Sequence, residues 1–137
     1  MKYLLDANVF SEMAMETPRA GVLDWLRWHE HESGTSSVVI AELDYGIQLM
    51  PHGQRRKRLE TWLAGLLEQT AVIPFDVEEV REYARLMAKM TQAGSTLPTK
   101  EAMIAATALV HGLAVVTRNV KDFERAGVPV LNPFQGA

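Results

Sequence analysis

Short apolar runs alternate along this chain with longer stretches in which apolar residues recur at helical spacing. Strands are expected at Lys2 to Leu5, Thr35 to Ser37, Val72 to Phe75, Leu113 to Thr117 and Val128 to Leu131. Segments with helical periodicity lie between them. Because strands that alternate with helices usually pair in parallel, the pattern predicts an α/β fold with a mainly parallel sheet.

Residues that start or stop helices support this division of the chain. The expected helices run over 8–15, from Pro18 to near His31, from Ser36 or Ser37 to Leu49, over 54–69, from Asp76 through Met90, and over 100–111. Ser36 or Ser37 and Asp76 are suited to cap a helix N-terminus, and Gly112 suits a position just after a C-terminus. Ser33-Gly34 is expected to break the chain between a helix and a strand.

The 137 residues have the size of one domain, and no repeat, linker or low-complexity stretch divides them. We therefore expect a single domain over 1–137. No N-terminal signal segment precedes the first strand, and no apolar run approaches the roughly 18 residues that span a bilayer. We expect no membrane association and a cytoplasmic protein.

The composition limits the chemistry that is available. The chain has no cysteine, which excludes disulfides and thiolate metal sites. Its four histidines share no metal-ligand spacing and are interpreted as surface or helix-end residues. The net charge of −3 argues against a protein that simply coats nucleic acid, but it is compatible with a nuclease whose acidic groups bind metal.

Polar residues follow several of the predicted strands at their carboxyl ends. Asp6 directly follows the first strand, and Asn119 and Asp122 follow the strand that ends at Thr117. Two further candidates lie on helices: Glu42 early in the helix after the second strand, and Glu101 at the start of the helix over 100–111. In an open parallel sheet, ligands bind outside the carboxyl ends of the strands, so these side chains are expected to share one rim. Taken singly, each has an ordinary explanation as a helix cap, a surface residue or a partner of the helix dipole.

Several carboxylates in one cleft repel one another unless they are protonated or neutralised. A hard divalent cation with oxygen ligands, Mg²⁺ or Mn²⁺, resolves this repulsion. Such a cation activates water and stabilises charge on a phosphodiester, so that no protein nucleophile is required.

Four segments resemble the motifs of PIN-domain toxins, the VapC and FitB-like proteins of toxin–antitoxin modules. They are 3–12 (YLLDANVFSE), 38–46 (VVIAELDYG), 104–108 (IAATA) and 115–123 (VVTRNVKDF), followed by a typical ending at 130–134 (VLNPF). The order and spacing match over essentially the whole chain.

This resemblance implies a three-layer α/β/α PIN fold, a Mg²⁺ or Mn²⁺ cofactor and endonucleolytic cleavage of RNA. It also implies a cognate antitoxin, a homodimer, and larger toxin–antitoxin assemblies that bind DNA through the antitoxin. Carried over by motif, the metal ligands are Asp6, Glu42 and Glu101, and Asn119 and Asp122 complete the catalytic set. The residues that would orient these ligands or water are Asn8, Ser11 and Thr117.

The chain departs from the family pattern at two positions. Ala7 stands where the family usually has Thr, and Glu101 stands where it usually has Asp. An extra methylene keeps the charge but moves the carboxylate. The alternative hypothesis is therefore a PIN-fold binding module with an impaired site, acting through antitoxin or RNA binding. A third reading, an aspartyl-phosphate enzyme, is disfavoured because Asp6 has no second Asp two residues on.

Basic residues offer candidate RNA contacts. Arg55 and Arg56 belong to the only basic run, which is either a solvated helix start or a contact for RNA or antitoxin. Arg118, within the fourth motif, is placed to touch a phosphate or to pair with a neighbouring carboxylate.

Overall fold

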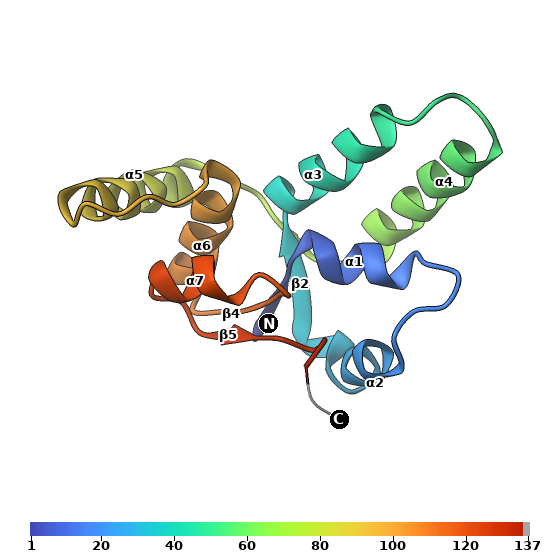
Figure 1. Cartoon of the computed structure of the whole chain (residues 1–137), viewed down its shortest axis with the longest axis horizontal. Helices are drawn as coiled ribbons and strands as arrows, with labels where there is room; N and C mark the ends of the chain where they lie inside the picture. Colours follow the sequence, from blue (N-terminus) through green and yellow to red (C-terminus); the bar gives the residue numbers. More distant parts are fainter. Residues whose placement is uncertain (136–137) are drawn as a thin grey trace.

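The computed structural model describes residues 1–135, whose five strands form one parallel sheet (Figure 1). The strands are β1 (Tyr3–Leu5), β2 (Ser33–Ser36), β3 (Val72–Ile73), β4 (Ala114–Val116) and β5 (Val130–Leu131). The helices are α1 (Ala7–Met13), α2 (Ala20–His29), the 3₁₀ turn η1 (Glu30–Glu32), α3 (Ser37–Gln48), α4 (Gln54–Gln69), α5 (Val77–Gln92), α6 (Thr99–His111) and α7 (Val120–Arg125). The predicted α/β fold with a mainly parallel sheet is confirmed.

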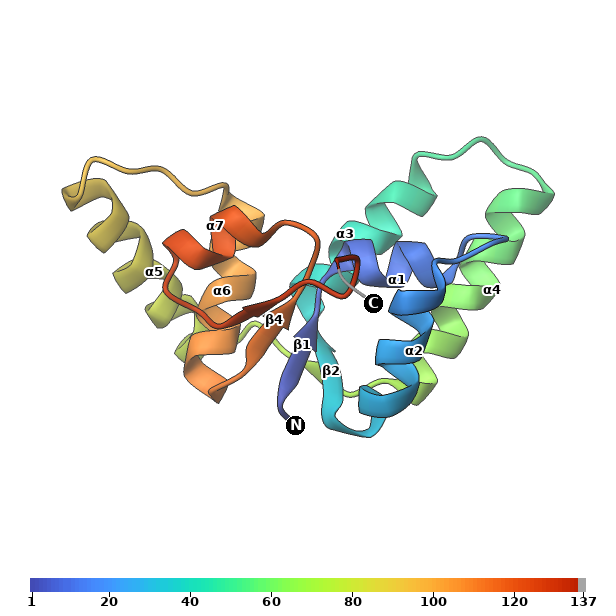
Figure 2. The same cartoon turned by 60° about the horizontal axis from the view of Figure 1, so that its bottom comes forward.

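The strand order places the first strand at the centre of the sheet. The order is β3-β2-β1-β4-β5, so the chain moves outward on one side of β1 and then returns to build the other side. Figure 2 shows α1, α2 and α4 to one side of β1 and β2, and α5, α6 and α7 to the other. The point where strand order reverses, at the carboxyl end of β1, is where α/β sheets of this kind form their ligand sites.

The start and stop residues act as the sequence predicts. Ser36 caps α3, accepting a hydrogen bond from the Val39 N–H at 3.2 Å. Asp76 caps α5 in a reciprocal arrangement with Glu79. Gly112 ends α6 with φ of 66°, a left-handed conformation that glycine adopts without strain.

Some element boundaries differ from the prediction. The helical stretch ends before Ser33-Gly34, as expected, but the strand predicted to start at Thr35 begins two residues earlier, at Ser33. The expected strand through Phe75 stops at Ile73, just before Pro74, which has no N–H to donate to a ladder. The six-residue helix α7 was not expected.

The sheet and its helices enclose a continuous apolar core. Its largest fully buried apolar side chains are Phe10, Phe123, Leu4, Ile104, Val9, Val22, Val39, Val115 and Val116. At the edge of this core a polar contact joins two helices: His111 at the end of α6 lies 2.8 Å from the buried carboxylate of Glu79 on α5. Within residues 1–135, no helix is both long and apolar enough to span a membrane.

Candidate functional site

Asp6 occupies the point where strand order reverses. Its backbone N–H donates to the carbonyl of Val116 at 3.0 Å, which continues the pairing of β1 with β4 by one residue. Its side chain caps α1, with Oδ1 accepting from the Ala7 N–H at 2.8 Å. The residue is only 6% exposed. Both the strand and the helix therefore fix the carboxylate in a nearly buried position.

Two polar side chains hold the second oxygen of Asp6. The hydroxyl of Thr117, at the end of β4, donates to Asp6 Oδ2 at 2.7 Å. Asn8 Nδ2 lies 3.0 Å from Thr117 Oγ1 and 3.4 Å from Asp6 Oδ2. Asn8 Oδ1 in turn accepts from the backbone N–H of Arg118 at 3.1 Å. Thr117 and Asn8, which were predicted to orient ligands or water, thus both contact the Asp6 carboxylate.

The surroundings of Asp6 disfavour its charge. Burial is the largest cause that raises the pKa of this carboxyl, and the charges of Glu42 and Glu101 raise it further. The hydrogen bonds from Thr117 and from the Ala7 N–H oppose these effects without cancelling them. The three acids predicted to share a rim are thus close enough to interact electrostatically.

Glu42 and Glu101 reach the rim from two helices. Glu42 lies within α3, and its Oε1 is 3.2 Å from the ammonium of Lys100. Glu101 lies in the first turn of α6, where the helix dipole favours a negative charge. Both are partly exposed, unlike Asp6.

The donor set suits a hard cation, since every charged ligand candidate is a carboxylate. Among residues 1–135, however, no group of three or more Asp, Glu or His side chains is arranged to coordinate a single ion. Mg²⁺ is commonly held by one or two carboxylates and several waters, so this arrangement fits such an ion without a full protein cage.

Asn119 and Asp122 lie one step further out. The Asn119 N–H donates to Thr117 Oγ1 at 2.9 Å, and its amide donates to Asp122 Oδ2 at 3.0 Å. The hydrogen bond from Asn119, followed by that from Arg125, lowers the pKa of Asp122. Asp122 is thus linked to Asp6 through two intervening residues, Asn119 and Thr117, and already has a cationic partner in Arg125.

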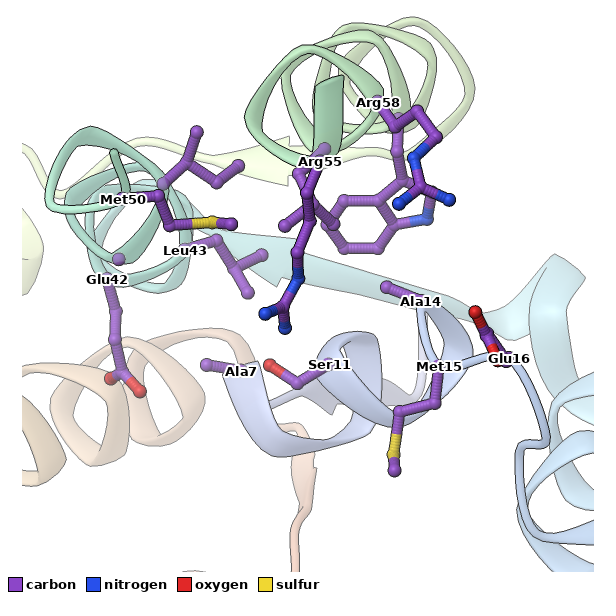
Figure 3. Close-up of a pocket in the computed structure, with 14 residues that line it drawn as sticks. Ala7, Ser11, Ala14, Met15, Glu16, Glu42, Leu43, Met50, Arg55 and Arg58 are labelled. Atoms are coloured by element: carbon purple, nitrogen blue, oxygen red, sulfur yellow. The ribbon is translucent and has the colours of Figure 1, made fainter. Parts of the chain in front are cut away.

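A cleft between α1, α3 and α4 opens beside the acids and has a volume of about 880 Å³. Ser11, Glu42, Arg55 and Arg58 line it together with apolar side chains, and Figure 3 shows Arg55 extending from α4 toward Ser11 on α1. Arg56 instead binds the segment that follows α3, donating to the carbonyl of Met50 at 3.1 Å. Only Arg55 of the two predicted contacts in this run faces the cleft.

Arg118 stacks on an aromatic ring near the end of the chain. Its guanidinium lies 4.0 Å from the centre of the Phe134 ring and 3.9 Å from Glu12 Oε1. Of the two roles that the sequence left open for Arg118, these contacts match the pairing with a carboxylate.

The sequence reasoning assigned no role to Glu12 or Lys100. Glu12 is 6% exposed, and its Oε2 accepts from the Arg19 N–H at 2.8 Å, which fastens the segment between α1 and α2. The signal was present, because Glu12 follows the buried Val9 by three residues and so shares its face of α1. Lys100 was given no role because the adjacent Glu101 was interpreted as the site residue. Only the three-dimensional structure reveals that Lys100 pairs with Glu42.

The chain is similar to known proteins over nearly its whole length. The PIN domain family matches residues 3–129. The VapC ribonuclease Y4jK of Sinorhizobium fredii (strain NBRC 101917 / NGR234) is 38% identical over 98% of this chain and 99% of its own length. The plasmid stability protein StbB of Pseudomonas syringae pv. tomato is 42% identical, covering 96% of this chain and 98% of that protein.

A solved structure has the same fold over nearly the whole length. A chain in the structure of FitAB bound to an IR36 DNA fragment aligns with a TM-score of 0.90 and 29% identity, covering 98% of this chain and 97% of that one. The similarity therefore extends well beyond the four motifs.

Proposed function

The chain belongs to the PIN domain family, and on that premise we propose that it is the ribonuclease toxin of a toxin–antitoxin module. In this role it hydrolyses internal phosphodiester bonds of RNA with the help of Mg²⁺ or Mn²⁺. The observation that carries the proposal is Asp6, a buried carboxylate at the sheet's switch point whose pKa is raised by burial and by the charges of Glu42 and Glu101. A site with this charge arrangement favours a bound cation. The ribonuclease name of a relative 38% identical over 98% of this chain supports the reaction type.

Asp6, Glu42 and Glu101 are the residues that would hold the ion, through direct bonds from one or two carboxylates and through the ion's bound waters. When bound, a divalent cation would activate water and stabilise charge on the phosphodiester. The proposed products of hydrolysis are a 5′-phosphate and a 3′-hydroxyl. Thr117 and Asn8 fix the orientation of the Asp6 carboxylate. Arg55 offers a positive charge to the RNA backbone at the mouth of the adjoining cleft.

The proposed protein partner is a cognate antitoxin that blocks the site. The likeness to a chain of the DNA-bound FitAB structure supports this, and we extend it to a homodimer and to larger assemblies that reach DNA through the antitoxin. The proposed location is the cytoplasm, where RNA and the antitoxin would be present.

Asp6→Asn tests the catalytic assignment. The amide keeps an oxygen that can accept from the Ala7 N–H, so the variant should fold, while cleavage of RNA with Mg²⁺ or Mn²⁺ should be abolished. Glu68→Gln removes a charge from the exposed surface of α4 and should cleave like the wild type. Equal cleavage by Asp6→Asn and the wild type would refute the assignment, and undiminished cleavage in EDTA would refute the metal dependence.

The second candidate function is a binding module whose site is impaired. Two observations favour it: Glu101 stands where the family usually has Asp, and no three acids of residues 1–135 converge on one point. Glu101→Asp distinguishes the two. Similar cleavage by wild type and variant supports the nuclease, whereas cleavage only by Glu101→Asp would make the natural chain a binding module.

A further inference from the structure

Lys100 is the only lysine or arginine among residues 1–135 that forms an ion pair with one of the three proposed metal ligands. Its Nζ lies 3.2 Å from Glu42 Oε1, and the pair joins the first turn of α6 to α3. Both residues line a second, smaller cleft of about 480 Å³ between these helices. The contact is a single ion pair at one oxygen of Glu42, Oε1.

The same turn of α6 carries two opposite charges that act on this site. Glu101 adds a negative charge that is felt by Asp6, while Lys100 neutralises part of the charge of Glu42. A divalent ion that binds Glu42 must either displace the ammonium from Oε1 or approach with the ammonium still nearby. Either way the lysine opposes the ion, because like charges repel at this distance.

We propose that Lys100 is a positioning residue that competes with the divalent cation for Glu42 and thereby sets the metal concentration at which the site is loaded. This inference rests on the proposed metal-dependent function. The ion pair is easily displaced, because the two side chains are 54% and 32% exposed and pairs of this kind contribute little to stability. Lys100 therefore tunes metal affinity without being needed for the fold.

Coulomb's law gives the size of the effect. A unit charge about 5 Å from a divalent ion, in a solvent-like dielectric and at physiological ionic strength, weakens binding about fivefold. Removing the charge of Lys100 should therefore tighten metal binding by about this factor. A methionine retains most of the aliphatic stem, so Lys100→Met changes the charge with little change in packing.

Direct Mn²⁺ titration, following the electron paramagnetic resonance signal of the free ion, measures the effect without relying on cleavage. Lys100→Met should bind Mn²⁺ about fivefold more tightly than the wild type. Lys100→Arg keeps the charge and should match the wild type. Lys89→Met removes the same charge from the exposed surface of α5 and should also match it. Equal melting temperatures would show that all four proteins fold alike.

Each other result has a distinct meaning. Unchanged or weaker Mn²⁺ binding by Lys100→Met, with binding by the wild type intact, would overturn the role of Lys100 and leave the proposed function standing. An equal gain in Lys89→Met would assign the effect to net charge and also overturn it. If none of the four proteins bound Mn²⁺, the metal dependence itself would fail, and the inference with it.

Discussion

The hydroxyl of Thr117 is the most informative atom to remove, because it contacts three polar groups at the site. It donates to Asp6 Oδ2 at 2.7 Å and accepts from Asn8 Nδ2 at 3.0 Å and from the Asn119 N–H at 2.9 Å. Thr117 is fully buried. Valine has nearly the same shape, so Thr117→Val deletes these contacts and leaves little or no cavity.

The expected loss of stability follows from these contacts. A hydrogen bond to a charged group contributes about 1.5–3 kcal/mol, while burying a methyl group in place of the hydroxyl returns about 0.8 kcal/mol. Asn8 and Asn119 are partly exposed, so water can replace their lost acceptor. Thr117→Val should therefore lower the free energy of unfolding by about 1.5 kcal/mol, which corresponds to roughly 5 °C in melting temperature.

The loss should depend on pH in a defined direction. The Thr117 hydrogen bond lowers the pKa of Asp6, so the valine variant raises that pKa further. A raised pKa of a carboxyl in the folded state means that stability falls as pH rises through that pKa. The gap between wild type and Thr117→Val should be full above the raised pKa values of Asp6 in the two folded proteins. It should shrink as pH falls through those values, and both of them lie above the ordinary Asp value of 3.8.

Urea denaturation at pH 7 and at pH 3 measures this gap, with Thr107→Val as the matched control. Thr107 is also fully buried, but its hydroxyl donates only to the carbonyl of Met103 in its own helix at 2.9 Å. That carbonyl already receives a helical N–H, so the control should change stability by less than about 0.5 kcal/mol. Indistinguishable stabilities of the two variants, or a gap that is the same at both pH values, would contradict the reasoning. Mn²⁺ affinity should also fall about 10- to 100-fold in Thr117→Val.

Two further perturbations test the fold around the site. Glu79→Gln should cost about 1–2 kcal/mol at pH 7 in urea denaturation, because the charged carboxylate that pairs with His111 is lost. Burial of Glu79 opposes its charge, but hydrogen bonds from the Asp76 N–H and His111 lower its pKa overall. The stabilisation from the charged carboxylate is therefore present above pH 4.5 and is lost as pH falls through the lowered pKa. An equal loss of stability in Glu79→Gln at pH 3 would contradict this reasoning. Gly34→Ala should cost about 1–3 kcal/mol, since a new Cβ would lie 2.9 Å from the carbonyl oxygen of Ala71 in the adjoining segment. Gly65→Ala on α4, where a Cβ meets nothing within 4 Å, should instead stabilise the chain by up to about 1 kcal/mol, and similar melting temperatures for both alanine variants would refute the steric argument.

The features of the fold that follow from local physics were predictable from the sequence. The helix over 54–69 has the predicted bounds because an apolar face and a preceding Pro-His-Gly segment define it. The start of β2 was missed because Ser33 and Gly34 have low strand propensity, and their pairing with Tyr3 and Leu4 of β1 is a tertiary contact. The helix α7 was missed because its six residues provide less than two turns of periodicity and no side-chain cap.

The site was predictable to the extent that it follows from the ends of strands. Asp6 and Thr117 come directly after β1 and β4, and the parallel pairing of these two strands brings them together. Glu42 and Glu101 are carried by helices, and their proximity to Asp6 depends on how α3 and α6 pack. The direction in which the Glu42 side chain turns, toward Lys100, depends on that packing as well and left no signal in the sequence.

The position of Asp6 reduces stability and prepares a site for the same physical reason. Burial and two nearby carboxylates make the charged form of Asp6 unfavourable. Keeping this carboxyl ionised in the folded chain therefore lowers the free energy of unfolding. Hydrogen bonds from Thr117 and from the Ala7 N–H offset only part of this effect. A divalent cation that binds the folded but not the unfolded chain would offset the rest of this loss of stability. At a concentration a hundred times its dissociation constant, it would stabilise the fold by about 2.7 kcal/mol. Under the proposed function, the unfavourable charge of Asp6 would therefore favour binding of the cation, and Lys100, which neutralises part of the charge of Glu42, would limit that binding.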